Sequence, residues 1–400
     1  MMMRLCQSAC FRLGRWVGLV GLLMLGGVSA ASAQSDLRRQ FEDKVTTFTL
    51  DNGLDFVIVE RHDAPVVSFT TYADVGSVNE PEGQTGIAHM FEHMAYKGTT
   101  TIGTKNIEKE MAALQRQEEA YLKLRRERAE PRPDSARVAE LERQFQQAQE
   151  KAESYMRGGE FENILQKNGV EGLNAYTSAD ATVYQYSLPA NKTELFFALE
   201  SDRFVNPVLR EFYTERDVVM EERRQRVGSS PNGRLVEAYV TSAFKAHPYG
   251  TPIIGHMSDL QKLSRTDAQE FFDTYYNARN LTVGIAGDVE PDRMRALAQK
   301  YFSRLPEGRE PPPVRTEEPK QFGERRVVLR EQARPRLMVG FSRPSMYSPD
   351  DPVYEVLADV LAGGRTSRLY KNLVETETAL AVQIPSYFAE FPGGQYENEF

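Results

Sequence analysis

The sequence predicts an α+β protein built from two tandem domains, each with a mixed sheet covered by helices. Short β-rich runs alternate with amphipathic helical runs along most of the chain, which is typical of sheets packed against helices. A proline-rich stretch divides the chain, and the order of strand, strand, loop and helix that opens the first part is repeated after it. The 400 residues are enough for two sizeable cores.

Residues 1–33 are predicted to be a signal peptide. Three arginines precede an apolar run over residues 16–30, and Ala-Ser-Ala at 31–33 resembles a cleavage site. The run is short for a membrane span, so a retained N-terminal anchor is the less favoured alternative. Both cysteines lie in this leader, and the mature chain would therefore contain no disulfide. We expect an exported protein, periplasmic or secreted, cleaved after Ala33.

The charge balance argues against a nucleic-acid partner. The formal net charge is −8, and the leader holds three of the arginines but no acidic residue. The mature chain would be still more acidic, whereas a nucleic-acid-binding domain needs a basic surface.

The first predicted strands lie at 45–50 and 54–60, around the hairpin turn signal Asp-Asn-Gly at 51–53. A third strand is predicted at 66–75. After the turn-rich segment 79–83, a helix is predicted that begins with Thr85 as its N-cap and stops at Gly98.

This helix carries the motif His89-x-x-Glu92-His93. Successive helical residues turn by about 100°, so His93 lies about 40° from His89, and Glu92 about 60° to its other side. Two imidazoles one turn apart can bind one zinc ion, and a carboxylate between them can reach a metal-bound water. The alternative is a hydrogen-bonded polar cluster, which would need several matched partners to satisfy three buried groups without a cation. The motif is also one of the metallopeptidase signatures.

Residues 105–157 predict a helical hairpin. Apolar residues keep three- and four-residue spacings on both sides of a break at 130–134 that contains two prolines, and each arm would be about 35 Å long. We expect the apolar seam to be satisfied within the hairpin itself. Two interpretations stay open, a solvated antiparallel pair and a docking arm for a partner, and the docking arm is slightly favoured.

A later helix, predicted from Thr214 to about Val227, offers a distal carboxylate ligand. Glu215 and Glu222 are seven residues apart and share one helical face. Val218 and Val219 lie between them, so we interpret Glu222 as the inward-facing ligand. The neighbouring Glu221 is predicted to face solvent.

The remaining elements complete the first domain and begin the second. The first domain is predicted to span 42–305 and the linker 306–320, which contains five prolines. The second domain, 321–400, lacks the motif, and we expect it to be non-catalytic and incomplete at Phe400. The other predicted strands are 173–178, 181–188, 281–286, 325–330 and 336–341, and the other predicted helices are 291–302 and 353–361.

With these residues in view, the chain resembles the pitrilysin and insulinase clan of zinc peptidases, and most closely the bacterial relatives of the mitochondrial processing peptidase β subunit. The resemblance implies tandem domains of the processing-peptidase type and one zinc ion per chain. It implies His89, His93 and Glu222 as zinc ligands, Glu92 as the general base and Glu215 as a carboxylate behind the ligands.

The resemblance runs from about Lys44 to the C-terminus and is interrupted by the hairpin. The family's third ligand usually lies nearer to the motif. An insertion of about the size of 105–157 accounts for the longer spacing, and a hairpin returns the chain close to where it left.

The resemblance also implies an edge strand that binds an extended substrate through Asn174, Ala175, Tyr176 and Thr177. The segment 373–381 lacks the arginine and tyrosine that partner halves contribute to substrate binding. Those residues would come from another half or subunit, or from a second copy in a homodimer. We interpret three further histidines as structural, namely His62, His247 and His256.

We therefore expect a zinc-dependent endopeptidase that hydrolyses peptides or small unfolded proteins. One alternative is a non-catalytic peptide-binding partner subunit of such a complex. Another is a structural adaptor organised around the hairpin. Partner subunits typically lose a ligand or the base, whereas the four residues of the predicted centre are all present here, which favours the enzyme.

Overall fold

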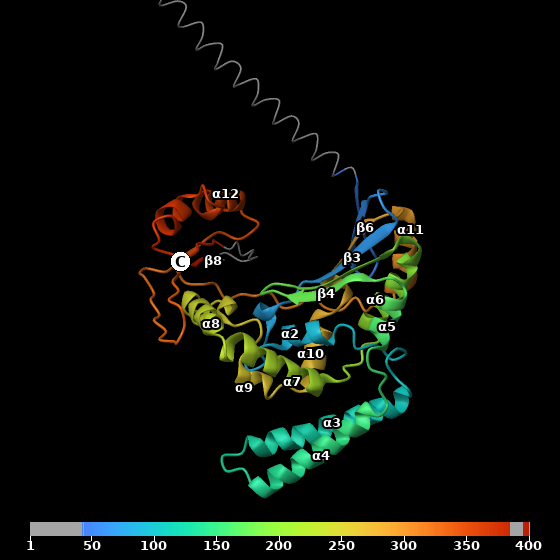
Figure 1. Cartoon of the computed structure of the whole chain (residues 1–400). Coiled ribbons are helices and arrows are strands. Elements are labelled where there is room, and N and C mark those ends of the chain that lie inside the picture. Colours follow the sequence, from blue (N-terminus) through green and yellow to red (C-terminus); the bar gives the residue numbers. More distant parts are fainter. Residues whose placement is uncertain (1–41, 43, 385–394, 400) are drawn as a thin grey trace, which may run out of the picture.

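The computed structural model describes residues 42, 44–384 and 395–399 (Figure 1). The predicted signal peptide and Phe400 lie outside these residues. Within them, no helix combines the length and the apolar character needed to cross a membrane.

The first domain is organised around a six-stranded mixed sheet with the strand order β1-β2-β6-β3-β5-β4. β6 is parallel to β2 and antiparallel to β3, so a late segment of the chain lies at the centre of the sheet. Gly287 ends β6, where a side-chain Cβ would lie 2.2 Å from the Val66 carbonyl oxygen. The strands are β1 (Val45–Thr49), β2 (Asp55–Glu60), β3 (Val66–Ala73), β4 (Glu171–Thr177), β5 (Thr182–Pro189) and β6 (Leu281–Gly287).

Helices cover one face of this sheet, because alternate strand residues are buried there and the residues between them are more exposed. Phe69 of β3 stacks on Phe196 at a ring distance of 4.0 Å, and Phe56 of β2 meets Phe302 at 5.7 Å. The helices α2, α7 and α10 lie below the sheet in Figure 1. Apart from the hairpin, the helices of the first domain are α2 (Ile87–Met94), α5 (Glu160–Lys167), α6 (Thr193–Val205), α7 (Phe212–Arg223), α8 (Pro231–Ala243), α9 (Met257–Leu260), α10 (Arg265–Tyr275) and α11 (Pro291–Phe302).

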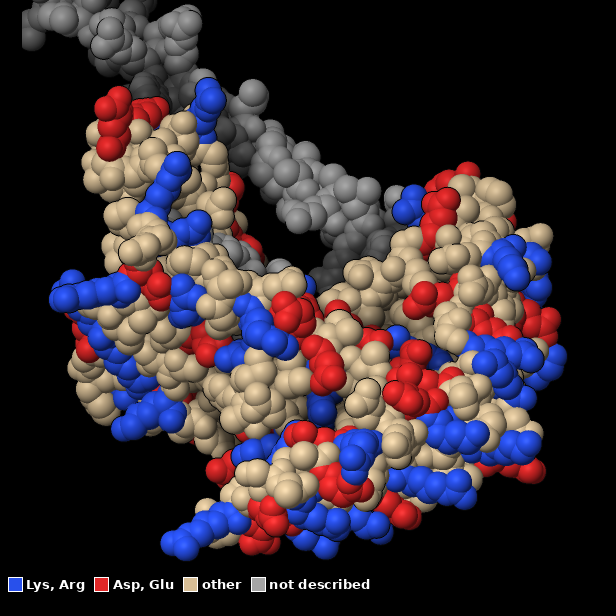
Figure 2. Space-filling view, turned by 60° about the horizontal axis from the view of Figure 1, so that its bottom comes forward, with Lys and Arg blue, Asp and Glu red and all other residues tan. Residues whose placement is uncertain are grey.

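Two long helices, α3 (Ile107–Arg128) and α4 (Ser135–Glu153), occupy the predicted hairpin. Asn106 caps α3 by accepting the Lys109 N–H, and Asp134 caps α4 by accepting the N–H groups of the second and third residues after it. Acidic and basic side chains are interspersed over the face that this hairpin presents in Figure 2.

The expectation that the hairpin seam is satisfied within itself is wrong. The buried Glu110 carboxylate accepts from Arg210 Nε at 2.7 Å, and Arg210 precedes α7. Tyr121 is 1% exposed and packs on Tyr213 of α7 at a ring distance of 4.5 Å. Tyr213 in turn donates to Glu118 at 2.6 Å. The half of the hairpin nearer the domain therefore belongs to the domain core.

We expect that replacing residues 105–157 with a short Gly-Ser linker prevents folding. The change leaves Arg210 buried without its carboxylate, at a cost of about 3–5 kcal/mol, and it removes Tyr121, whose loss costs about as much. Together these approach a typical total stability of about 5–15 kcal/mol. Replacing only 127–137, the tip of the hairpin, should leave the unfolding temperature nearly unchanged. Thermal unfolding of both variants checks this, and a stable protein without 105–157 would contradict it.

The second domain begins with fewer strands than predicted. The prediction of a strand at 325–330 is wrong, because no described strand pairs with it and Val328 is 67% exposed. The predicted strand at 336–341 corresponds to β7 (Met338–Ser342), which pairs antiparallel with β8 (Gln395–Glu399), and the predicted helix is α12 (Asp351–Ala362).

The segment between the domains has no regular structure but is anchored to the first domain. The Glu318 carboxylate accepts the backbone N–H groups of residues 245, 246 and 247 at 2.8–3.0 Å. Arg325 donates to the carbonyls of Ser242 and Ala243 at the end of α8. These contacts hold the end of the predicted linker, and the residues just after it, against the first domain. The start of the linker is held as well, where Asn277 donates to the Arg309 carbonyl.

Candidate metal centre

The helix α2 begins differently from the prediction. The prediction that Thr85 is the N-cap is wrong, because its hydroxyl donates to Asp259 at 2.6 Å and accepts from the His256 N–H. Gly86 occupies the cap position with a φ of 90°, which glycine adopts without strain. The Glu80 carboxylate accepts the N–H groups of Gly86 and Ala88, both at 2.9 Å. Burial raises the pKa of Glu80 to about 8, against the effect of these two hydrogen bonds.

The other end of α2 also departs from the prediction, since the helix ends at Met94, before Gly98. Gly98 has a φ of 98° and serves the loop that follows. A Cβ there would lie 2.4 Å from the Ile102 carbonyl oxygen. Gly98 therefore does not end the helix. It allows two backbone segments of the loop to lie close together.

The helix α7 presents Glu222 to α2, while Glu221 faces solvent and pairs with Arg224 at 3.2 Å. The reasoning from the two valines is half right, because Val219 is fully buried and Val218 is 47% exposed. A π-helical turn, η3 (Arg224–Gly228), continues α7.

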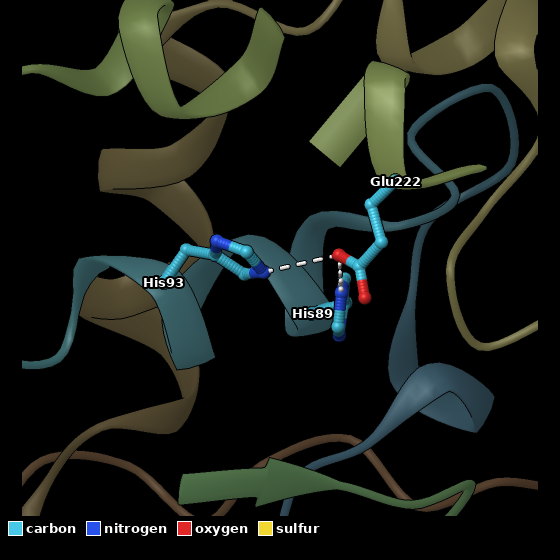
Figure 3. Close-up of side chains that lie close together, drawn as sticks. All are labelled: His89, His93 and Glu222. Carbon is cyan, nitrogen blue, oxygen red and sulfur yellow. Dashed lines mark hydrogen bonds and ion pairs between the residues drawn. The ribbon is translucent and has the colours of Figure 1, made fainter. Parts of the chain in front are cut away.

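The structure brings His89, His93 and Glu222 together (Figure 3). One carboxylate oxygen, Glu222 Oε2, lies 3.1 Å from His89 Nε2 and 3.3 Å from His93 Nε2. One ligand atom from each residue can be chosen so that all three lie within 4.8 Å of one another. His89 is buried, and the other two side chains are about one-fifth exposed.

Two more carboxylates lie at the far nitrogen atoms of the imidazoles. Glu92 Oε2 lies 3.2 Å from His89 Nδ1, and Glu215 Oε2 lies 3.5 Å from His93 Nδ1. Each imidazole therefore has a carboxylate at both nitrogens. The other oxygen of Glu222, Oε1, lies 2.8 Å from Arg226, whose side chain reaches it from the π-helical turn.

These residues fit a zinc ion. Two imidazole nitrogens and one carboxylate oxygen are a donor set of catalytic zinc sites, which keep a fourth position open. Burial lowers the pKa of His89, but hydrogen bonds to Glu222 and Glu92 outweigh this effect and raise it to about 9. The metal-free cluster thus stabilises a positive charge where a metal cation would lie.

We expect zinc affinity to rise with pH up to about 9. A ligating histidine must be neutral, so zinc has to displace the His89 proton at any pH below its raised pKa of about 9. The apparent affinity should then rise about tenfold per pH unit for each proton displaced, whereas an ordinary histidine would level off near pH 6.5. Chelator-buffered zinc titrations between pH 6 and 9 check this, and an affinity that is constant above pH 7 would contradict it.

The four predicted substrate-binding residues lie on β4, the edge strand of the sheet, which pairs with β5 and with no other described strand. Asn174 and Tyr176 are exposed, whereas Ala175 and Thr177 are half-buried. The Thr177 hydroxyl is near enough to Glu92 to lower its pKa, yet makes no hydrogen bond of normal length within the described residues. β4 therefore runs beside the cluster.

The other histidines in the described part of the chain lie apart from this cluster. His62 lies 2.7 Å from Asp288 on the surface. His247 is buried and accepts the Tyr249 N–H through Nδ1. Neither these two nor His256 contributes to a group of residues that could hold a metal.

Sequence reasoning missed three residues around the cluster: Glu80, Lys97 and Arg226. Arg226 follows the predicted ligand Glu222 by four residues, so helical spacing gave a signal for it. Lys97 lies beyond the end of α2 and contacts Glu215, so its spacing from His93 gave no signal. Glu80 carried no such signal, because it reaches α2 from an irregular segment.

The motif helix and its partner glutamate place the protein in the class of His-x-x-Glu-His metallopeptidase folds. Residues 56–126 and 148–256 match the family model described as insulinase (peptidase family M16), and residues 262–395 match that of the peptidase M16 inactive domain. The chain belongs to peptidase family M16. Within the hairpin, the first match omits only residues 127–147.

Individual relatives agree with this assignment. The zinc protease PqqE of Helicobacter pylori is 29% identical over 375 residues, which cover 91% of this chain and 70% of that protein. The crystal structure of a protease from Helicobacter pylori superposes with a TM-score of 0.72 at 26% identity, over 89% of this chain and 74% of that one. Human cytochrome b-c1 complex subunit 1 is 26% identical over 322 residues, which cover 79% of this chain and 55% of that protein.

Proposed function

We propose that the chain is a zinc endopeptidase that hydrolyses extended peptides or small unfolded proteins. The observation that supports this most directly is the convergence of His89, His93 and Glu222, with Glu92 beside them. His89, His93 and Glu222 would hold one zinc ion per chain. Glu215 would orient His93 from behind.

Zinc, when bound there, supplies a Lewis acid for a water molecule and for the scissile carbonyl. Glu92 would accept a proton from that water and pass it to the leaving amine. Burial favours its protonated form, but the hydrogen bond and the charge of His89 outweigh burial and lower the pKa of Glu92. This shift belongs to the metal-free protein, in which His89 is protonated; the positive charge of a bound zinc ion would likewise favour the ionised carboxylate that a proton acceptor must be.

The free edge of β4 would bind the substrate. An extended peptide can add to an exposed sheet edge, so that backbone hydrogen bonds provide affinity and side-chain pockets provide preference. Asn174, Ala175, Tyr176 and Thr177 lie on this edge strand, and α2 packs beneath it. This mode selects unfolded or flexible chains, because a folded protein rarely offers a free extended segment.

A non-catalytic partner subunit is the second candidate, because one relative is named as a subunit of the cytochrome b-c1 complex. We favour the enzyme, since this chain has the two histidines and both glutamates of the proposed centre. We further propose export through the predicted signal peptide, and pairing with a second half, with another subunit or with a second copy. The hairpin α3–α4 remains a candidate docking arm.

Metal removal tests the function. The purified full chain should contain about one zinc ion per molecule and cleave unstructured peptides, since the described residues contain one such donor set. A chelator should abolish cleavage, and added zinc should restore it. If the chain binds zinc but cleaves no peptide, alone or with a partner half, the non-catalytic interpretation is correct. If it binds no zinc, the cluster is not a zinc site and the proposed enzymatic function fails.

A further inference from the structure

We infer that Lys97 is a positioning residue for the metal centre, because it holds the carboxylate that faces His93. This inference rests on the proposed zinc site. Lys97 follows α2 on the loop that leads to the hairpin, and its side chain is 24% exposed.

Lys97 is connected to the metal centre through Glu215. Its Nζ donates to Glu215 Oε1 at 2.5 Å and lies 3.3 Å from Glu211 Oε2. The other oxygen of Glu215, Oε2, lies 3.5 Å from His93 Nδ1. One oxygen of Glu215 thus contacts the Lys97 ammonium group, and the other contacts the His93 imidazole. Because Nδ1 of His93 faces Glu215, its Nε2 faces Glu222.

The backbone of Lys97 is itself held in place. Its carbonyl accepts from Arg210 Nη1 at 3.0 Å, and Arg210 is anchored in the core by Glu110. Arg210 also donates to the carbonyls of Thr99 and Ile102 in the same loop. The side chain of Lys97 therefore extends from a backbone position that is fixed in the loop.

Glu211 adds to this arrangement from the residue before α7. It has a φ of 59°, a left-handed conformation that costs free energy for a residue other than glycine. Glu211 and Glu215 are four residues apart, a spacing at which like charges repel on a helix. Lys97 lies within ion-pair distance of both, so it compensates this repulsion and ties α2 to the first turn of α7. These two helices carry all three proposed ligands.

The test compares Lys97→Met with Lys97→Arg in the full chain. We expect Lys97→Met to weaken zinc binding several-fold, less than the roughly 10- to 100-fold loss for removing an outer partner of a ligand, because Lys97 acts through Glu215. The absorption bands of the cobalt-loaded protein should also change. Lys97→Arg keeps the charge and should restore most of the affinity and the wild-type bands. Lys109→Met, at an exposed lysine of α3, is the matched control and should bind zinc like the wild type.

A second variant keeps the inference testable if Lys97→Met does not fold. Lys97→Met in a Glu215→Gln protein leaves no pair of like charges facing the lost ammonium group, so it should fold, and its zinc affinity should equal that of Glu215→Gln alone, because Lys97 acts through Glu215. Wild-type zinc affinity and cobalt bands in folded Lys97→Met would overturn the inference, as would a further loss of zinc affinity when Lys97→Met is added to Glu215→Gln. A wild-type chain that binds no zinc would overturn the proposed function, and this inference with it.

Discussion

Glu222→Gln should lower the zinc affinity at least 10- to 100-fold, the range that the loss of an outer partner alone produces. The reason is that Glu222 Oε2 lies within 3.3 Å of both imidazole nitrogens. An amide in its place supplies no negative charge and leaves two imidazoles with an additional open position. Zinc titration against a competing chelator measures the change.

Glu221→Gln is the matched control, because it makes the same chemical change one residue away. Glu221 is exposed and pairs with Arg224, so its zinc affinity should equal that of the wild type. Glu215→Gln should lie between the two, with metal retained and activity reduced, since Glu215 contacts His93 and would not bind the ion itself. If Glu221→Gln is the variant that loses metal, the ligand set has to be redrawn.

Glu92→Gln should reduce peptide hydrolysis by a factor on the order of 10² or more while zinc remains bound. The amide keeps the shape of the side chain but cannot accept a proton, and loss of a general base has an effect of this size. The measurement is kcat for an unstructured peptide, with the zinc content of the same sample determined in parallel. Normal turnover by zinc-loaded Glu92→Gln protein would show that another group acts as base.

A control for this variant separates chemistry from metal retention. Glu92 also lies 3.2 Å from His89 Nδ1, so its replacement could disturb a ligand. His89→Ala removes that ligand and should lose both zinc and activity. A Glu92→Gln protein that keeps zinc but loses activity is therefore distinguished from one that loses the metal.

The local pattern of α2 could be predicted because helical periodicity depends only on nearby residues. The apolar positions of the motif helix are buried, among them Met90 and Phe91, and the polar window faces the cluster. The same reasoning on α7 distinguished Glu222 from Glu221. It was less reliable for Val218, because the 3.6-residue period shows which residues share a face but not how far a neighbouring element covers them.

The hairpin shows where local pattern was insufficient. Its three- and four-residue spacing predicts two paired helices, and α3 and α4 are present. The same spacing does not reveal that Glu110 pairs with Arg210, one hundred residues away. A buried carboxylate on α3 has the same local pattern whether its partner lies in the hairpin or in the domain.

The sequence by itself determined the sheet strands of the first domain, the motif helix and which glutamate of α7 lies with the two histidines, because periodicity, turn signals and residue spacing are local properties. Only the tertiary structure decided that Glu80 caps α2, that Lys97 bridges Glu211 and Glu215 at the start of α7, and that the base of the hairpin is part of the core. These contacts join segments distant in sequence, and they depend on how the helices pack on the sheet. Packing follows from the complementary shapes of many side chains at once, which no short stretch of sequence contains.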